Sequence, residues 1–289
     1  MHLKTISNED ERFVLLDLDK PWQLAEAVGL KRTEANYQQH LIKLVQLAGE
    51  VLTEKTTGVV LGPKAGYEAI NTKTANTGLV LSLDDNFYPH DPFSLPQFLP
   101  DWGVEHIKNN YGVIKLNLFY NPQEKLANEK NKLLVEVYDY AQYEKLDLVV
   151  ELNIILDGKL KPKDKREVFL TTQLNVVREL QNMVDLFILE YPFTSLACAT
   201  LTAELDVPWI MNDQSIKYTE LKNNLRIALE GGASGLMMGR NIFREAPQFD
   251  KRKVDEFFNS WRKFLNTEGR DRVLELARIT QEVGLMTDI

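Results

Sequence analysis

The sequence contains little cysteine and little histidine, and both shortages exclude classes of site. Cys198 is the only cysteine among 289 residues, which excludes an intrachain disulfide and a cluster of metal-bound thiolates. The four histidines, at positions 2, 40, 90 and 106, lack the spacing of metal ligands. We therefore expect no metal site in this protein.

Long apolar runs are also missing. No run reaches the roughly 18 apolar residues that a membrane-spanning helix needs, and the first residues, MHLK, lack the apolar core of a signal peptide. The net charge is −8, from 34 basic and 42 acidic residues, which argues against binding the phosphate backbone of a nucleic acid. These features predict a cytoplasmic protein that has neither a membrane nor a nucleic acid as its partner.

The sequence does contain a regular alternation of short apolar runs and longer amphipathic segments. Because 44% of its residues are hydrophobic, the chain can bury a large core. Runs of strand length lie at 13–19, 58–63, 78–83, 112–120, 146–152, 186–190, 208–212 and 235–239. Helical spacing is found at 33–53, 101–109, 122–143, 167–183, 215–230, 251–265 and 270–283, and loops are expected at 84–100 and 157–165.

Eight strands alternating with helices predict an α/β protein, a (β/α)8 TIM barrel that forms a single domain over residues 1–289. The alternative is a doubly wound open sheet. That alternative is disfavoured because no early strand is followed by a glycine-rich dinucleotide-binding turn. The barrel is therefore the predicted fold.

One predicted strand carries a lysine where apolar residues are expected. Residues 112–120 are rich in β-branched and aromatic side chains, as in a strand buried on both faces, yet Lys115 lies near the middle. A buried ammonium must be paired or face a polar cavity, because an isolated buried charge is very costly. Such a lysine is a candidate Schiff-base nucleophile or anion ligand. In the alternative, Lys115 lies near the strand end and its ammonium reaches water.

Polar side chains gather at the carboxyl ends of the predicted strands, where TIM-barrel enzymes place their chemistry. In this position, Glu151 is a candidate general acid/base and Arg240 a candidate ligand for a phosphate or carboxylate. The alternatives are a structural Glu151–Lys115 ion pair and a salt bridge of Arg240 at the rim. The strand-end set is Asp19, Lys115, Asn117, Glu151, Asn153, Glu190, Asn212, Asp213 and Arg240, of which Glu190 is interpreted as structural.

The order and spacing of several segments resemble the class I aldolases of the tagatose-1,6-bisphosphate aldolase family and the related sulfofructose-phosphate aldolases. The similarity spans nearly the whole chain, through residues 66–68, 74–79, 114–116, 149–152, 185–192, 232–240 and 267–269. The resemblance implies a (β/α)8 barrel that cleaves phosphorylated ketoses through a lysine Schiff base, without a metal or other cofactor. A small carbonyl compound or sugar derivative is the implied partner.

Four site residues follow from this resemblance by position. Lys115 matches a lysine that contacts substrate, and Glu151 matches the acid/base glutamate. Arg240 matches the arginine that holds a substrate phosphate, and Asp19 matches the aspartate that closes the first strand. We predict Lys115, Glu151 and Asp19 as catalytic residues. The predicted substrate-binding residues are Arg240, Asn117, Asn153, Asn212 and Asp213.

The chain departs from the family's pattern at three of its strand ends. The family's Schiff-base lysine lies two residues before the glutamate of a Lys-x-Glu-x-Pro segment, where this chain has Ile188. The family's Ser-x-Gly turn, which cradles a phosphate, corresponds here to Asp213, Gln214 and Ser215, and an aspartate would repel a phosphate. The family also has Gln-Arg after its first-strand aspartate, where this chain has Lys-Pro at 20–21.

These departures leave two hypotheses for the function. In the first, the protein is a divergent carbon–carbon lyase in which Lys115 replaces the missing nucleophile, as in transaldolases, whose Schiff-base lysine lies on the fourth barrel strand. In the second, it is a non-catalytic aldolase homologue, a pseudoenzyme that binds a sugar derivative or a protein partner. Residues 254–264 carry an apolar stripe that is suited either to homo-oligomer formation or to packing on the barrel.

Overall fold

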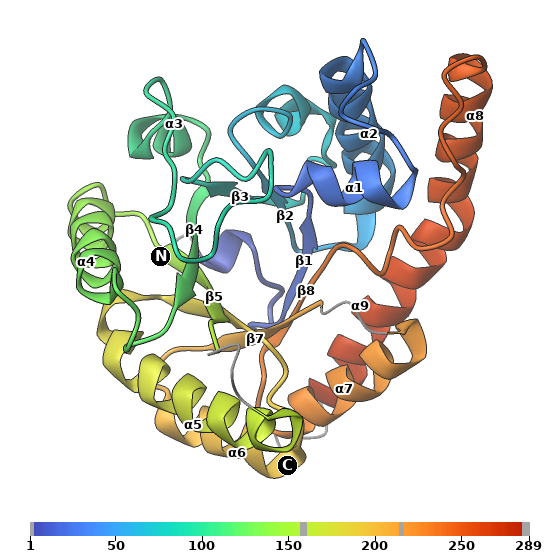
Figure 1. Cartoon of the computed structure of the whole chain (residues 1–289). Helices are drawn as coiled ribbons and strands as arrows, with labels where there is room; N and C mark the ends of the chain where they lie inside the picture. The colour runs from blue at the N-terminus through green and yellow to red at the C-terminus, as the bar shows by residue number, and fades with distance from the viewer. Residues whose placement is uncertain (1–2, 157–160, 214–216, 285–289) are drawn as a thin grey trace.

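The protein is a closed barrel of eight parallel strands, each paired with its neighbours in chain order, so the predicted (β/α)8 fold is confirmed (Figure 1). The computed structural model describes residues 3–156, 161–213 and 217–284. The strands are β1 (Phe13–Asp17), β2 (Gly58–Leu61), β3 (Gly78–Ser82), β4 (Val113–Tyr120), β5 (Leu148–Ile154), β6 (Leu186–Leu189), β7 (Trp209–Asn212) and β8 (Gly235–Met238). Pairing of β1 with β8 closes the barrel.

The helices surround this barrel and follow the strands in sequence (Figure 1). They are α1 (Pro21–Ala27), α2 (Tyr37–Leu52), α3 (Val104–Asn109), α4 (Ala127–Tyr143), α5 (Pro162–Leu180), α6 (Ser195–Glu204), α7 (Tyr218–Glu230), α8 (Val254–Phe264) and α9 (Arg270–Gly284). Shorter helical turns are η1 (Leu3–Thr5), η2 (Thr53–Lys55), η3 (Tyr67–Thr72), η4 (Gln181–Met183) and the π-helical turn Leu265–Gly269. None of the described helices is both long and apolar enough to cross a membrane.

Several predicted boundaries differ from the structure by a few residues. The loop expected at 157–165 ends early, because α5 begins at Pro162, and proline suits a first helical position where its missing N–H costs no hydrogen bond. Residues 157–160 of that loop lie outside the described part of the chain. Helix α6 was not predicted, although Thr194 marks its start by accepting a hydrogen bond from the backbone N–H of Ala197.

Alternate residues of each strand point into the barrel, which fixes where the polar side chains lie. The apolar interior contains Val113 of β4, Val149 of β5 and Leu186 of β6. Because side chains alternate between the two faces of a strand, the residues two positions further along also point inward. Lys115 and Glu151 therefore face the barrel interior above an apolar floor.

The apolar stripe of α8 packs within the chain. Phe257, Phe258, Trp261 and Phe264 are all buried, with Trp261 fully inaccessible to solvent. Lys43 of α2 lies over the ring of Phe258 at 4.1 Å, which joins this helix to its neighbour. Of the two interpretations of the stripe, packing against the protein's own core accounts for these four aromatic side chains.

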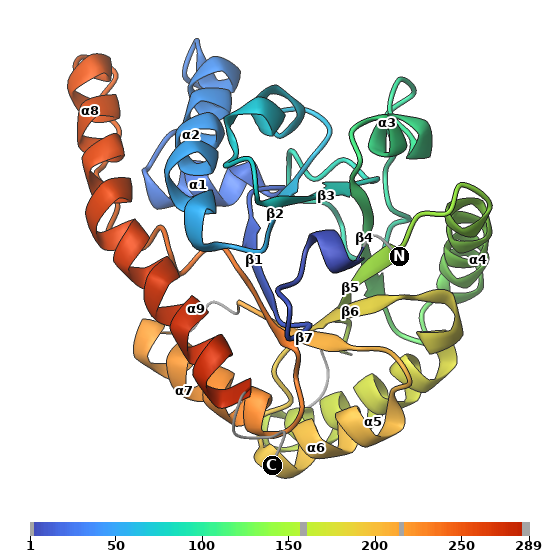
Figure 2. The same cartoon turned by 180° about the vertical axis from the view of Figure 1, so that it is seen from behind.

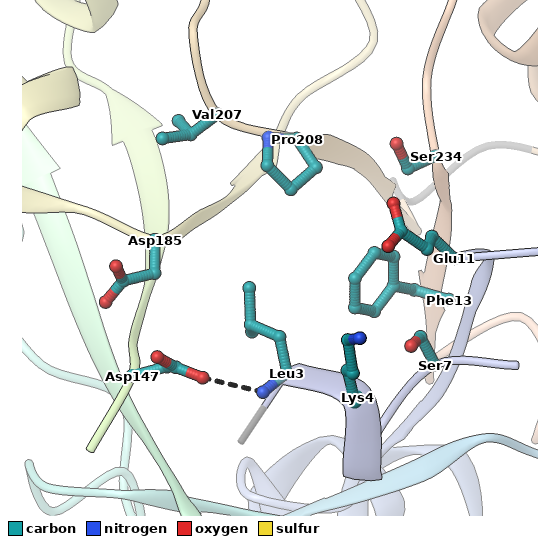
Figure 3. A pocket seen from close by; sticks show the side chains of 10 residues that line it. All are labelled: Leu3, Lys4, Ser7, Glu11, Phe13, Asp147, Asp185, Val207, Pro208 and Ser234. Atoms are coloured by element: carbon teal, nitrogen blue, oxygen red, sulfur yellow. Dashed lines mark hydrogen bonds between the residues drawn. The ribbon is translucent and has the colours of Figure 1, made fainter. Parts of the chain in front are cut away.

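The amino-terminal segment closes the end of the barrel at which the strands begin, and the turn η1 (Leu3–Thr5) lies near the centre of the ring of strands (Figure 2). Ile6 is fully buried in the barrel interior, and the backbone N–H of Leu3 donates to Asp147, 2.7 Å away (Figure 3). A cavity of about 340 Å³ lies beside this segment, lined by residues at the strand starts such as Phe13 and Pro208. In this fold the starts of the strands generally contribute to stability, and active sites lie at the opposite end of the barrel.

Candidate active site

A buried ion cluster lies at the carboxyl ends of β1, β4 and β5, and Lys115 is at its centre. The Lys115 ammonium is 2.7 Å from each of three oxygens, Oδ2 of Asp19, Oε2 of Glu151 and Oδ1 of Asn117. Its side chain is completely buried. Lys115 is therefore a paired interior charge, and its ammonium does not reach water at a strand end.

The charges of this cluster stabilise one another. Although burial alone would lower the pKa of Lys115, the carboxylates of Asp19 and Glu151 raise that pKa above its usual value. Burial would likewise raise the pKa of each carboxyl, but the lysine ammoniums hold the pKa of Asp19 well below its usual range and also lower the pKa of Glu151. At neutral pH the cluster is ionised, and Glu151 is a charged base.

A second lysine, which the sequence analysis did not place in the site, completes the cluster. The Lys20 ammonium is 2.7 and 2.6 Å from the two carboxylate oxygens of Glu151 and 3.4 Å from Oδ2 of Asp17. Pro21 is the first residue of α1, so Lys20 stands directly between β1 and that helix. One sequence feature could have identified Lys20 as a site residue. It follows the first strand directly, in a Lys-Pro pair that departs from the family's pattern.

Asp17 and Asp19 lie close together at the end of β1, and their pKa values are shifted in opposite directions. Burial and the neighbouring charge of Asp19 raise the pKa of Asp17 well above its usual range, whereas the pKa of Asp19 is lowered. Two carboxyl groups with pKa values moved apart are suited to divide the roles of proton donor and charged base. Asp17 is the further residue that the sequence analysis left without a role in the site.

Buried polar side chains on neighbouring segments form hydrogen bonds to the cluster. Ser82 donates its hydroxyl hydrogen bond to Oδ2 of Asp19, and Trp102 donates to the backbone carbonyl of Ser82 over 2.9 Å. Asn117 donates to Asp84, with its Nδ2 3.2 Å from Oδ2 of that residue. Asn117 thus acts as a buried link between Lys115 and Asp84.

Above the cluster is a cleft of about 210 Å³ between the ends of the strands. Five residues that the sequence analysis assigned to the site line this cleft, namely Glu151, Asn153, Asn212, Asp213 and Arg240. Asn212 donates to Oε1 of Glu151 over 2.9 Å, so it orients the carboxylate. The structure thus brings these five residues together, with Lys115, Asp19 and Asn117 in the buried layer beside them.

The carboxylate of Asp213 is hydrogen-bonded to the loop that follows β8. Its Oδ2 accepts hydrogen bonds from the backbone N–H groups of Gly239, at 3.1 Å, and Asn241, at 2.8 Å. Its Oδ1 accepts another from the side-chain amide of Asn241. Successive backbone N–H groups of this kind form an anion-binding concavity, and here a carboxylate of the chain itself occupies it.

Arg240 lies at the rim of the same cleft. Its guanidinium is 3.0 Å from Oε2 of Glu26 and 5.8 Å from the centre of the Trp22 ring. The side chains of this ion pair are 34% and 60% exposed, so the pair contributes little stability and leaves the guanidinium within reach of a ligand. Arg240 therefore forms a salt bridge with Glu26 and also lines the cleft.

Strand β6 contributes no polar side chain at the level of Glu151. Ile188 pairs with Glu151 on one side and Ile210 on the other, and it is fully buried in the barrel interior. Within the described part of the chain, no three His, Cys, Asp or Glu side chains are grouped so that they could hold a metal ion. The carboxylates of this site face lysine ammoniums instead.

No family model matches the chain. Among curated relatives, a tagatose 1,6-diphosphate aldolase of Staphylococcus aureus is 21% identical over 317 residues, which cover 98% of this chain and 95% of the relative. Tagatose 1,6-diphosphate aldolase 2 of Streptococcus pyogenes is 24% identical over 294 residues, covering 89% of this chain and 88% of the relative. The resemblance to these aldolases that the sequence analysis described is confirmed.

Several solved structures with the same fold are named as aldolases. An archaeal fructose 1,6-bisphosphate aldolase aligns with a TM-score of 0.61 at 16% identity, over 96% of this chain and 98% of that one. Another such structure carries its catalytic lysine covalently bound to the carbinolamine intermediate of the substrate, with a TM-score of 0.62, 16% identity and the same coverage. A fructose-bisphosphate aldolase from Slackia heliotrinireducens aligns with a TM-score of 0.63 at 16% identity, over 96% of this chain and 88% of that one.

Proposed function

We propose that this protein is an aldolase-type carbon–carbon lyase that acts on a small ketose or a related carbonyl compound of carbohydrate metabolism. The observation that carries the proposal is the carboxylate of Glu151, which lies in the cleft between the ammoniums of Lys20 and Lys115. Its relatives are named as tagatose 1,6-diphosphate aldolases, and its structural neighbours as fructose 1,6-bisphosphate aldolases. These names favour a lyase over the non-catalytic alternative.

Aldol cleavage requires a polarised carbonyl group and a base for the hydroxyl proton of the departing aldehyde. Glu151 is ionised and lies in the cleft, so it is suited to take that proton. The Lys20 ammonium, which also lines the cleft, supplies positive charge where the carbonyl oxygen gains negative charge. Asp17, with its raised pKa, is suited to return a proton.

Lys115 and Asp19 act in this proposal as positioning residues. The three N–H groups of the Lys115 ammonium face Asp19, Glu151 and Asn117. Lys115 is not one of the described residues that line the cleft. It therefore holds Glu151 in place and keeps it charged. The covalent role that the sequence analysis considered for Lys115 remains a prediction.

The cleft favours a small substrate with few anionic groups. Its volume of about 210 Å³ is below the roughly 300–1,000 Å³ that is usual for pockets that take drug-sized ligands. Asp213 already occupies the backbone donors of the loop after β8, whereas Arg240 offers one cationic group at the rim. Asn153 and Asn212 are suited to bind hydroxyl groups. An unphosphorylated or monophosphorylated sugar fits this arrangement better than a bisphosphate.

Product analysis by NMR tests this proposal. The protein is incubated with a panel of ketoses and their monophosphates, and aldehyde and ketone products are followed over time. We expect cleavage of at least one compound, and we expect Glu151→Gln to lower the rate by 10²–10⁴-fold, the usual contribution of a general base. Glu190→Gln is the matched control, because the same change one strand away, outside the cleft lining, should leave the rate within a few-fold.

Two outcomes separate the hypotheses. Equal rates for wild type and Glu151→Gln, measured with protein that shows the same thermal unfolding, would refute the role of Glu151. Thermal stabilisation by a sugar without any turnover would instead favour the non-catalytic alternative, since a ligand at a hundred times its Kd adds about 2.7 kcal/mol of stability.

A further inference from the structure

The two lysines of the ion cluster differ in their access to the cleft. Lys115 is completely buried, and each of its three partners lies 2.7 Å from its ammonium. The side chain of Lys20 is 13% exposed and lines the cleft. A molecule bound in the cleft therefore meets the Nζ of Lys20 directly, whereas Lys115 lies behind its partners.

We infer that Lys20 is the residue whose amine forms a covalent imine with the carbonyl substrate. This inference deepens the proposed lyase function and rests on it. It assigns the nucleophile to the loop after β1, at a position that neither the sequence analysis nor the comparisons mark as catalytic.

The surroundings of Lys20 supply the groups that imine formation needs. Both oxygens of Glu151 lie within 2.7 Å of its Nζ, so a base is already in contact with the amine. Asp17 lies 3.4 Å from the same nitrogen and also lines the cleft. Nucleophile, base and proton donor therefore meet at one side of the cleft, and Asn153 and Arg240 are further lining residues that a substrate can contact.

The strand beside that of Glu151 strengthens this assignment. Ile188 of β6 is level with Glu151 in the strand register and is packed into the apolar interior, so this position of β6 provides no amine. Lys20 instead reaches Glu151 from β1, across the barrel mouth, over a sequence separation of 131 residues. The long side chain of lysine allows this reach from a fixed backbone at the start of α1.

The reaction balances with the groups present. The Lys20 ammonium gives one proton to Glu151, and the amine lone pair forms a bond to the carbonyl carbon while the π electrons move to the oxygen. That oxygen takes protons from the nitrogen and from the Glu151 carboxyl through the carbinolamine, and it leaves as water. The sum is R–NH3⁺ plus O=C giving R–NH⁺=C plus H2O. In cleavage, the carbon–carbon bond pair then flows to the imine nitrogen as the hydroxyl proton passes to Glu151.

Lys20 must lose a proton before it reacts, and its neighbours oppose this loss. Burial alone would lower the pKa of Lys20, but Asp17, Glu151 and Asp19 raise it well above its usual value. The Lys115 ammonium of β4 also faces this group, and Arg240 lines the same cleft. Because the neutral amine is the nucleophile, adduct formation should become faster as the pH rises from about 7 towards 10.

Reductive trapping tests the inference. Wild-type protein is incubated with dihydroxyacetone and cyanoborohydride at pH 7 and pH 9, and the modified lysine is located by peptide mass spectrometry. We expect saturable labelling of Lys20 that is faster at pH 9, with little labelling of Lys115. Mapping the adduct in the wild type avoids dependence on a variant that fails to fold.

A substitution that keeps the charge provides the second measurement. Lys20→Arg retains a cation beside Glu151 but cannot form an imine, so it should lose more than nine-tenths of the trapped adduct and at least a hundredfold in cleavage rate. Lys64→Arg is the matched control, because Lys64 is also ion-paired, 2.6 Å from Asp85, but lies outside the cleft lining. It should leave both quantities unchanged.

The outcomes separate this inference from the proposed function. Cleavage with the adduct on Lys115, or with no trapped adduct, would overturn the role of Lys20 while leaving a lyase. Trapping on Lys20 without cleavage of any sugar would support the imine and refute the lyase. Absence of both would overturn both proposals. Lys20→Arg protein that cleaves sugar at the wild-type rate would also overturn the inference.

Discussion

At the scale of single residues, oppositely charged neighbours allow lysine side chains to be buried in this protein. The sequence left two positions open for Lys115, one buried and paired and one near the strand end with its ammonium in water. The structure shows the first, and pairing with Asp19 and Glu151 explains how a fully buried ammonium is tolerated. The sequence could identify that Lys115 needed a partner, since its neighbours in the strand are apolar. It could not identify Lys20 as a member of the same cluster, because contact with Glu151 arises only when β1 and β5 meet in the barrel.

Glu190, just after β6, leads to a prediction about stability. Burial raises its pKa from the ordinary 4.5 to about 7, so the folded state holds a proton that the unfolded state releases. Between these pH values the unfolded state binds fewer protons, and the free energy of unfolding should fall by about 3 kcal/mol as the pH rises from 4.5 to 7, then level off. Urea unfolding across this range measures the change.

Two substitutions check the origin of this pH dependence. Glu190→Gln cannot ionise, so it should lose the part of the decline that Glu190 causes and be more stable than wild type at pH 8. Glu68→Gln, at an exposed position, should keep the wild-type curve. A decline as large in Glu190→Gln as in the wild type would show that other groups are responsible.

At the scale of elements, the strand ends determine which segments meet in the site. The β5 residues Glu151 and Asn153 and the β7 residue Asn212 line one cleft, as parallel strands with a common direction require. The sequence placed these residues at strand ends from the apolar runs before them. The hydrogen bonds of Asp213 to the loop after β8 could not be predicted, because they depend on how the two loops pack.

The loop after β8 gives a prediction about anion binding. Asp213→Ser removes the carboxylate that accepts from the N–H groups of Gly239 and Asn241, and Arg240 is adjacent. The variant should therefore bind inorganic phosphate more tightly than the wild type does. With phosphate at ten times its Kd, the stability gain is about 1.4 kcal/mol, which thermal unfolding detects.

Asp185→Ser is the matched control for this prediction. Asp185 also accepts a backbone hydrogen bond, from Leu148 over 2.7 Å, but at the opposite end of the barrel. Its replacement should not create a phosphate response. An equal response of the two variants, or none from Asp213→Ser, would contradict an anion site at the loop after β8.

At the scale of the whole molecule, the barrel separates residues that stabilise the fold from the proposed catalytic site. The amino-terminal segment packs into one end, and the ion cluster and cleft lie at the other. The closed arrangement of eight strands agrees with our proposal that the chain forms one domain. Assembly into a homo-oligomer remains a prediction, and the buried aromatic residues of α8 do not supply the surface for it.

Ile6 tests this division between the two ends. Its side chain is fully buried in the barrel floor, so Ile6→Ala should lower the free energy of unfolding by about 2–5 kcal/mol. Cleavage by the protein that remains folded should stay within twofold of wild type. Urea unfolding and rate measurements at low temperature give the two quantities, and loss of activity without loss of stability would contradict the separation.

The sequence by itself determined the barrel and the strand ends that carry the site. Apolar runs of strand length alternate with amphipathic helices, and backbone geometry converts that alternation into parallel strands with their carboxyl ends on one face. Glu151, Asn153 and Arg240 could be assigned to the cleft on that basis.

Only the tertiary structure decided how the charges pair. Lys20 and Glu151 are separated by 131 residues, and Asp213 and Asn241 by 28, so no local pattern records either contact. Electrostatic interaction depends on distance and burial, and both quantities are set when the barrel closes. The barrel therefore buries Lys115 behind its partners and gives Lys20 access to the cleft.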